Sequence, residues 1–151
     1  MNNPVKIDAD VINYILSMQK EGEESASRQE GADRHIPGAG QFRAFIDEMP
    51  GGFFIYRADG TEEIIYVNKA LLRMFDCETE EAFRELTGNS FRGIVHPDDL
   101  EAVEKSIWEQ IAASQYDLDF VEYRIISKTG QIRWVDDYGH FIHSEEAGDI
   151  F

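Results

Sequence analysis

The first apolar residues of the chain recur at helical spacing, with alternating gaps of four and three residues. They are Ile7, Val11, Tyr14 and Met18, and Ile15 widens the same stripe. Positions at this period form one face of an amphipathic helix, which we predict over residues 1–21. The polar segment that follows offers this stripe no partner. We therefore expect the helix to mediate self-association, giving a homodimer.

Residues 22–40 carry almost no apolar side chains. They are rich in Glu, Ser, Gln and Gly and include one proline. Such a segment cannot offset the entropy of its own ordering by burying surface. We interpret it as a flexible linker that leads into a single domain over residues 41–151.

The domain begins with a helix and two strands. Apolar residues at positions i, i+3, i+4 and i+7 predict a helix over residues 42–49, which Pro50 and the two glycines after it stop. Runs of β-branched and aromatic residues over 53–57 and 64–68 predict two strands. The turn residues between these runs predict a hairpin.

Helix signals follow the second strand. Asn68 is placed to cap a helix over residues 69–75, while Thr79 begins another helix that Gly88 ends. The longest helix is predicted to open at residues 96–99, which read His-Pro-Asp-Asp. Proline suits the first helical position, and the two carboxylates suit the positive end of the helix dipole.

The last third of the domain has the pattern of strands. Residues 116–127 and 131–143 form two long runs joined by a turn at Gly130. Residues 149–151 begin a third run, and we expect this strand to continue beyond Phe151 in the natural protein. Two strands, then helices, then three strands predict an α+β domain, an antiparallel sheet with helices on one face.

Charge and cysteine content narrow the range of functions. The chain has 14 Lys and Arg against 30 Asp and Glu, a net charge of −16. This charge repels phosphate backbones and anionic lipids, so we expect no nucleic-acid partner and no membrane contact. Cys77 is the only cysteine. A single cysteine cannot form an internal disulfide or a multi-cysteine metal centre, and this low cysteine content favours a reducing, cytoplasmic location.

Three local sequences together resemble the PAS domain family across about residues 42–151. Residues 65–70 (IYVNKA) are similar to the second strand of the family and the asparagine-capped helix after it. Residues 95–99 (VHPDD) are similar to the start of its connecting helix. Residues 122–125 (EYRI) and 133–135 (RWV) are similar to its paired long strands.

The resemblance implies a five-stranded sheet that encloses a pocket against its helices. It implies a non-catalytic sensory or regulatory module of a bacterial signalling protein, which passes its signal to an output domain such as a histidine kinase or a cyclic-dinucleotide enzyme of the diguanylate cyclase kind. Six residues fall on elements that face the pocket in the family, although core packing alone would also explain them. They are Phe91, Ile94, Val103, Ile107, Tyr123 and Trp134.

No cofactor is predicted, although an unidentified small molecule could occupy such a pocket. The flavin-binding branch of the family needs a cysteine where this chain has Ser90, and haem in the family is often held by a histidine on the connecting helix, which has none between residues 98 and 114. We also predict no metal site. His96 and the two aspartates after it point in different directions, while His140 and His143 project from opposite faces of a strand.

Two questions stay open from the sequence. Glu122 and Arg124 lie on one strand face with apolar residues, so they either pair across the sheet with residues such as Arg133 or Asp136, or contribute polar groups to the pocket. The function is either that of a ligand sensor or that of a pure dimerisation module without ligand. An enzyme is the least favoured reading, because no spacing brings two titratable groups together.

Overall fold

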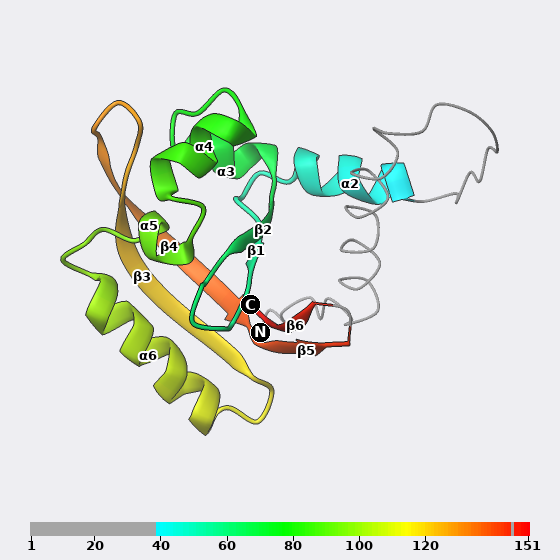
Figure 1. Cartoon of the computed structure of the whole chain (residues 1–151), viewed down its shortest axis with the longest axis vertical. Helices are drawn as coiled ribbons and strands as arrows, with labels where there is room; N and C mark the ends of the chain where they lie inside the picture. The colour runs from blue at the N-terminus through cyan, green and yellow to red at the C-terminus, as the bar shows by residue number, and fades with distance from the viewer. Residues whose placement is uncertain (1–38, 146) are drawn as a thin grey trace.

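The computed structural model describes residues 39–145 and 147–151 of the chain (Figure 1). The predicted N-terminal helix and most of the predicted linker lie outside these residues. The same holds for the proposed dimerisation stripe of Ile7, Val11, Tyr14, Ile15 and Met18, so self-association through it stays a prediction.

The described residues form helices and strands in the predicted order: a helix, a pair of strands, a run of helices and a final run of strands. The first half holds α2 (Ala39–Glu48), β1 (Phe54–Tyr56), β2 (Ile64–Val67), α3 (Lys69–Met74), α4 (Glu80–Thr87) and α5 (Phe91–Ile94). The second half holds α6 (Leu100–Ala113), β3 (Leu118–Ile126), β4 (Ile132–His140), β5 (Ile142–Ser144) and β6 (Gly148–Ile150). The α+β class is confirmed. Two differences are that α5 was not predicted, because four residues around a glycine show no helical period, and that one predicted strand is divided into β4 and β5.

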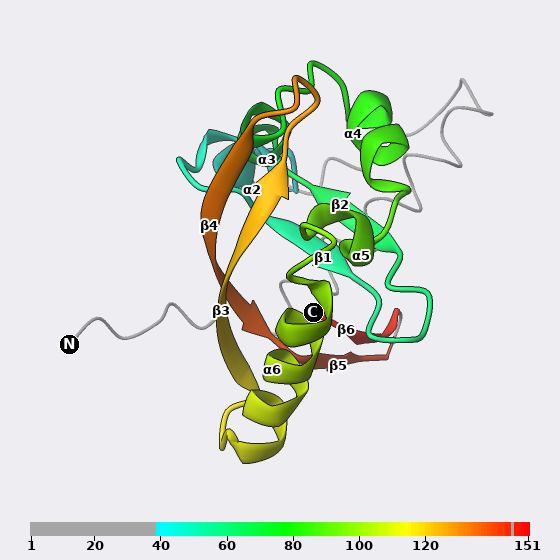
Figure 2. The same ribbon diagram turned by 90° about the vertical axis from the view of Figure 1, so that its left-hand side faces the viewer.

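The strands form three antiparallel pairs, β1–β2, β3–β4 and β5–β6. Figure 2 shows the long, twisted β3–β4 pair with α6 running beside β3. The predicted strand over residues 131–143 is interrupted at Phe141, whose backbone N–H donates instead to the Asp117 carbonyl at 2.9 Å. The end of the chain lies beside β1, since the backbones of Tyr56 and Phe151 exchange two hydrogen bonds of 2.9 Å.

The core has two parts, on the two sides of the β1–β2 pair. The larger cluster packs the helices onto the inner face of β3, where Val121, Tyr123 and Ile125 alternate with exposed residues. The smaller cluster joins Ile46 of α2 to residues of β1, β2, β5 and β6. Period-two alternation along β3 therefore determines which of its side chains face the interior.

Asn68 holds three segments together at the start of α3. Its side-chain oxygen accepts from the N–H groups of Leu71 (3.1 Å) and Phe53 (2.8 Å), and its amide donates to the carbonyls of Ile46 and Gly51, both at 3.0 Å. The predicted cap is confirmed, and the side chain is fully buried. All of its hydrogen-bonding capacity is thus used within the fold.

The start of α6 differs from the prediction. Asp99 is the residue before the helix, but its side chain makes no capping hydrogen bond. Its carboxylate accepts from the Arg124 backbone N–H (3.0 Å), Nε (2.9 Å) and Nη2 (2.5 Å). Pro97 was predicted at the first helical position, but α6 begins at Leu100, and the Asp99 carboxylate makes a bidentate ion pair that fixes α6 to β3.

Candidate functional site

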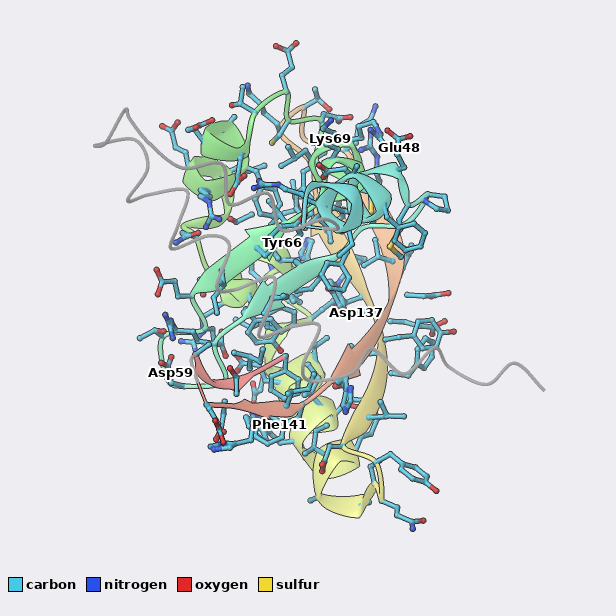
Figure 3. All side chains as sticks on the ribbon, turned by 90° about the vertical axis from the view of Figure 1, so that its right-hand side faces the viewer. Glu48, Asp59, Tyr66, Lys69, Asp137 and Phe141 are labelled. Atoms are coloured by element: carbon cyan, nitrogen blue, oxygen red, sulfur yellow. The ribbon has the colours of Figure 1, made fainter. Side chains whose placement is uncertain are left out.

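An open cavity of about 490 Å³ lies between the β1–β2 turn, α5, α6 and the end of the chain. Acidic side chains outnumber basic ones in its wall. The lining residues are Tyr56, Ala58, Asp59, Gly60, Glu62, Phe91, Arg92, Glu101, Glu104, Lys105, Ile107, Trp108 and Phe151. Figure 3 shows Asp59 at the turn end of the β1–β2 hairpin. The cavity therefore combines an apolar floor with a charged rim, as ligand sites commonly do.

A column of aromatic rings forms the floor. The Tyr56 ring stacks between Phe91 (centroids 4.4 Å apart, planes at 4°) and Phe151 (5.2 Å, 17°). Trp108 meets Phe151 edge-on at 5.4 Å, and Tyr123 meets Phe91 edge-on at 6.2 Å. Side chains from β1, β3, α5, α6 and the chain end thus pack into one aromatic cluster, in which Trp108 is the most exposed ring at 49%.

Backbone hydrogen bonds fix the acidic rim over this floor. The Phe91 N–H donates to the Glu62 carbonyl at 3.0 Å, and the Ile64 N–H donates to the Asn89 carbonyl at 3.0 Å. Ser90 caps α5 by accepting from the Arg92 N–H at 3.3 Å. The hairpin turn is therefore bound directly to the start of α5, which places the Glu62 side chain at the cavity.

Two carboxylates face each other here without adequate partners. Glu62 Oε2 and Glu104 Oε1 are buried atoms that have no hydrogen-bond partner within the described part of the chain. The Nε atom of Arg92 lies 3.5 Å from each of them. Burial raises the pKa of Glu62 and the nearby Glu104 raises it further, while Arg92 acts in the opposite direction. A single guanidinium is thus shared between two carboxylates and compensates the charge of neither one fully.

Tyr56 is close enough to this pair, and to two aspartates in the interior, for all four charges to act on its hydroxyl. Its side chain is buried and lines the cavity. Burial raises the pKa of Tyr56 far above its usual value, and Asp137, Asp119, Glu62 and Glu104 raise it further. The phenol therefore keeps its proton at neutral pH and offers a hydrogen-bond donor beside the cavity.

A second pair of carboxyls lies deeper, on the inner face of β3 and β4, where Figure 3 labels Asp137. Asp119 is opposite Gly139 in the strand register and Asp137 is opposite Val121, so the two aspartates are diagonal neighbours. The Tyr123 hydroxyl donates to Asp137 Oδ2 at 2.7 Å. Asp119 Oδ2 is buried and has no hydrogen-bond partner among the described residues. Burial, with Asp137 adding to it, raises the pKa of Asp119 to about 7.

The structure brings five of the six predicted pocket residues into one buried cluster. Phe91 and Ile107 also line the cavity, whereas Ile94, Val103 and Tyr123 belong to the packed core around it. Whether these residues bind a ligand stays a prediction.

The prediction that Trp134 lines the pocket is wrong, because its side chain is 71% exposed on the outer face of β4. It lies opposite Arg124 in the register, while Tyr123 lies opposite Val135. Directly opposed residues share a face and successive residues alternate, so Tyr123 and Trp134 point to opposite sides of the pair.

The partners suggested for Glu122 and Arg124 are also corrected. Arg124 pairs with Asp99 instead of a residue on β4, and Arg133 pairs with Asp76 at 3.0 Å. Glu122 lies opposite Asp136 on the exposed outer face. Neither Glu122 nor Arg124 lines the cavity.

The sequence reasoning missed the polar groups of the site. Asp119 and Asp137 are in phase with the apolar residues that face the interior, and a charged residue in such a phase was the available signal. The Glu62–Glu104 pair joins a turn to a helix 42 positions later, and no local spacing indicates that contact.

Within the described ranges, no group of three or more His, Cys, Asp or Glu side chains could hold a metal ion. No helix of these same residues is long and apolar enough to cross a membrane. Cys77 is buried, and burial raises the pKa of its thiol, so it lacks the thiolate character of a reactive cysteine.

Comparison with known proteins decides the family. The model of the PAS_3 family, described as a PAS fold, matches residues 64–151. The chain belongs to the PAS domain family. No curated protein matches it.

Solved structures share the fold at low sequence identity. A PAS domain from a two-component sensor histidine kinase is 20% identical (TM-score 0.57), with 74% of this chain and 87% of that one covered. A domain of a sensory box sensor histidine kinase/response regulator from Geobacter sulfurreducens is 16% identical (TM-score 0.54; 80% and 96% covered). The PAS domain of a LuxR-family transcriptional regulator from Burkholderia thailandensis, in complex with ethanol, is 19% identical (TM-score 0.53; 72% and 91% covered).

Proposed function

We propose that this PAS domain is a non-catalytic sensor that binds a small molecule in the cavity between the β1–β2 turn and α6. The bound state is passed to an output domain of the parent bacterial signalling protein, such as a histidine kinase or a diguanylate cyclase. We place the domain in the cytoplasm, which its single cysteine favours.

The observation that carries this proposal is the cavity itself. Its volume of about 490 Å³ is in the range of small-molecule sites, and an aromatic floor and polar groups meet in it. The ethanol complex of the Burkholderia thailandensis PAS domain supports the proposal, because it shows a small molecule bound by the same fold.

Native mass spectrometry of freshly purified protein tests the proposal. We expect a fraction of the protein to carry a small molecule that is lost on denaturation. Ala58→Trp, which fills the cavity, should abolish this species, while Ala113→Trp on the exposed end of α6 should keep it. A bare polypeptide mass, together with no increase in melting temperature across a panel of small metabolites, would overturn the proposal.

One observation favours the second candidate, a dimerisation module. The outer face of β3–β4 exposes large apolar side chains, with Trp134 at 71%, Tyr138 at 79% and Ile132 at 56%. Such a patch commonly marks a protein contact, and we assign it to a second copy of this chain. Trp134→Glu with Tyr138→Glu should convert a dimer to a monomer in analytical ultracentrifugation, whereas Leu86→Glu on α4 should not. A monomeric wild-type chain at high micromolar concentration excludes this candidate.

A further inference from the structure

We propose that the cavity binds an organic cation, an ammonium or amidinium group carried on a flat apolar body. This inference rests on the proposed small-molecule function and names the class of ligand.

Buried polar atoms at the cavity lack hydrogen-bond partners among the described residues. Glu62 Oε2 and Glu104 Oε1 are buried acceptors without a partner in the described residues. The Tyr56 side chain, only 7% exposed, lines the same cavity with its phenol. Unsatisfied buried polar groups are costly and rare in native structures. A ligand that supplies several N–H donors would satisfy the two acceptors and leave the phenol oxygen available as a third.

The charged residues of the cavity wall favour a cation. The wall holds four acidic residues, Asp59, Glu62, Glu101 and Glu104, against two basic ones, Arg92 and Lys105. Arg92 is shared between Glu62 and Glu104 at 3.5 Å from each, a distance too long for the short contacts of a strong ion pair. The residual negative charge favours a cation and disfavours an anion, and the net charge of −16 acts in the same direction.

The aromatic floor defines the remainder of the ligand. Tyr56 stacks between Phe91 and Phe151, with Trp108 edge-on to Phe151. Both faces of Tyr56 are thus covered, so the ring that is open to a ligand is Trp108, which lines the cavity and is 49% exposed. An open indole face binds a flat apolar body by stacking and attracts a nearby cationic group. A purely aliphatic or strongly hydrated cation would leave this floor unused. The site therefore fits an amine or amidine with an aromatic or similarly flat substituent.

Three probes of the same shape separate the charge from the apolar body: 2-phenylethylamine, 2-phenylethanol and phenylacetate. We expect isothermal titration calorimetry of the full chain to show the amine binding about tenfold or more tightly than the alcohol, because a charge-assisted hydrogen bond replaces a neutral one. Phenylacetate should not bind measurably. Affinity for the amine should fall as salt is raised, and affinity for the alcohol should not.

Matched variants test which residues cause the preference for the amine. Glu62→Gln and Glu104→Gln should each remove most of the preference for the amine, and Glu122→Gln on the outer face of β3 should leave it unchanged. Arg92→Gln removes the competing cation and should strengthen amine binding. The probe series on the wild-type chain decides the question even if a variant fails to fold.

The outcomes separate this inference from the proposed function. If the alcohol or phenylacetate binds as well as the amine, the cation inference is wrong while the cavity remains a small-molecule site. If the amine preference survives both glutamate variants, the charge recognition lies elsewhere and the inference is also wrong. If none of the probes binds, the inference fails, and native mass spectrometry decides separately whether the cavity holds another molecule.

Discussion

The Tyr123 hydroxyl donates a 2.7 Å hydrogen bond to Oδ2 of Asp137 across the inner face of β3 and β4. This bond satisfies one of two carboxyls that face the interior from these strands. Burial still raises the pKa of Asp137, and the neighbouring Asp119 oxygen has no partner among the described residues. The domain therefore keeps two acids next to its aromatic cavity at a cost in stability, which is typical of functional sites.

Asp119 should make the domain less stable as the pH rises from about 4 to about 7. Its pKa is about 7 in the folded state and 3.8 as a reference, so between about pH 4 and 7 the folded state holds a proton that the unfolded state has lost. The free energy of unfolding therefore falls as the pH rises through this window. Asp119→Asn should stabilise the domain at pH 8 by on the order of 2 kcal/mol, and should have little effect at pH 4.

Urea unfolding between pH 4 and 8 measures this difference. Asp117→Asn, on an exposed residue before β3, is the matched control and should follow the wild-type curve. Parallel curves for wild type and Asp119→Asn would show that Asp119 does not titrate in this range.

Gly139 provides the space that the Asp119 carboxylate occupies. A Cβ atom at position 139 would lie 2.3 Å from Asp119 Oδ2. Gly139→Ala should therefore destabilise the domain by about 1–3 kcal/mol in urea unfolding, whereas Gly60→Ala, with no atom within 4 Å, should be nearly neutral. Adding Asp119→Ala should restore much of the loss, and additive effects in this double-mutant cycle would contradict the contact.

The Asp99–Arg124 pair should stabilise the domain only while Asp99 is ionised. The hydrogen bonds from Arg124 lower the pKa of Asp99 to about 2 from 3.8. Stability from this pair is present above pH 3.8 and is lost as the pH falls through 2. Asp99→Ala should lower the melting temperature at pH 7 and much less at pH 2. Asp98→Ala is the control, and equal effects of the two variants at pH 7 would contradict the assignment.

Asn68 should be among the most sensitive polar residues of the fold. Replacing it with alanine removes two accepted and two donated hydrogen bonds in a fully buried place. We expect Asn68→Ala to cost about 2–4 kcal/mol, because lost capping adds to unsatisfied backbone groups. Thr79→Ala removes one exposed capping bond and should cost about 1 kcal/mol. Similar urea midpoints for the two variants would show that the Asn68 network contributes little.

Local signals allowed much of the fold to be predicted from the sequence. Asn68 caps α3, Thr79 caps α4, and Gly88 ends α4 with φ at 63°, as their residue types indicate. Each of these depends on contacts within a few residues. The break at Phe141 was not predictable, because it depends on a hydrogen bond to Asp117, which lies before β3 and far from Phe141 in sequence.

The site was less predictable because it depends on register and distant contacts. Trp134 was placed inside by family resemblance, although the turn at Gly130 pairs it with Arg124 on the outer face. The Glu62–Glu104 pair needs both the position of the hairpin turn and the rotation of α6. Phe91 and Ile107, which line the cavity, were predicted from the family resemblance and not from a local pattern.

The most direct test of the cavity as a cation site uses Trp108 as its reporter. The chain has two tryptophans, so Trp134→Phe leaves only Trp108, which lines the cavity. Titration of this variant with 2-phenylethylamine should give a saturable change in Trp108 fluorescence. The change should weaken with 2-phenylethanol, and it should weaken again when Glu62→Gln and Glu104→Gln are added. No saturable change with the amine, or an equal response after both glutamates are replaced, would contradict the account.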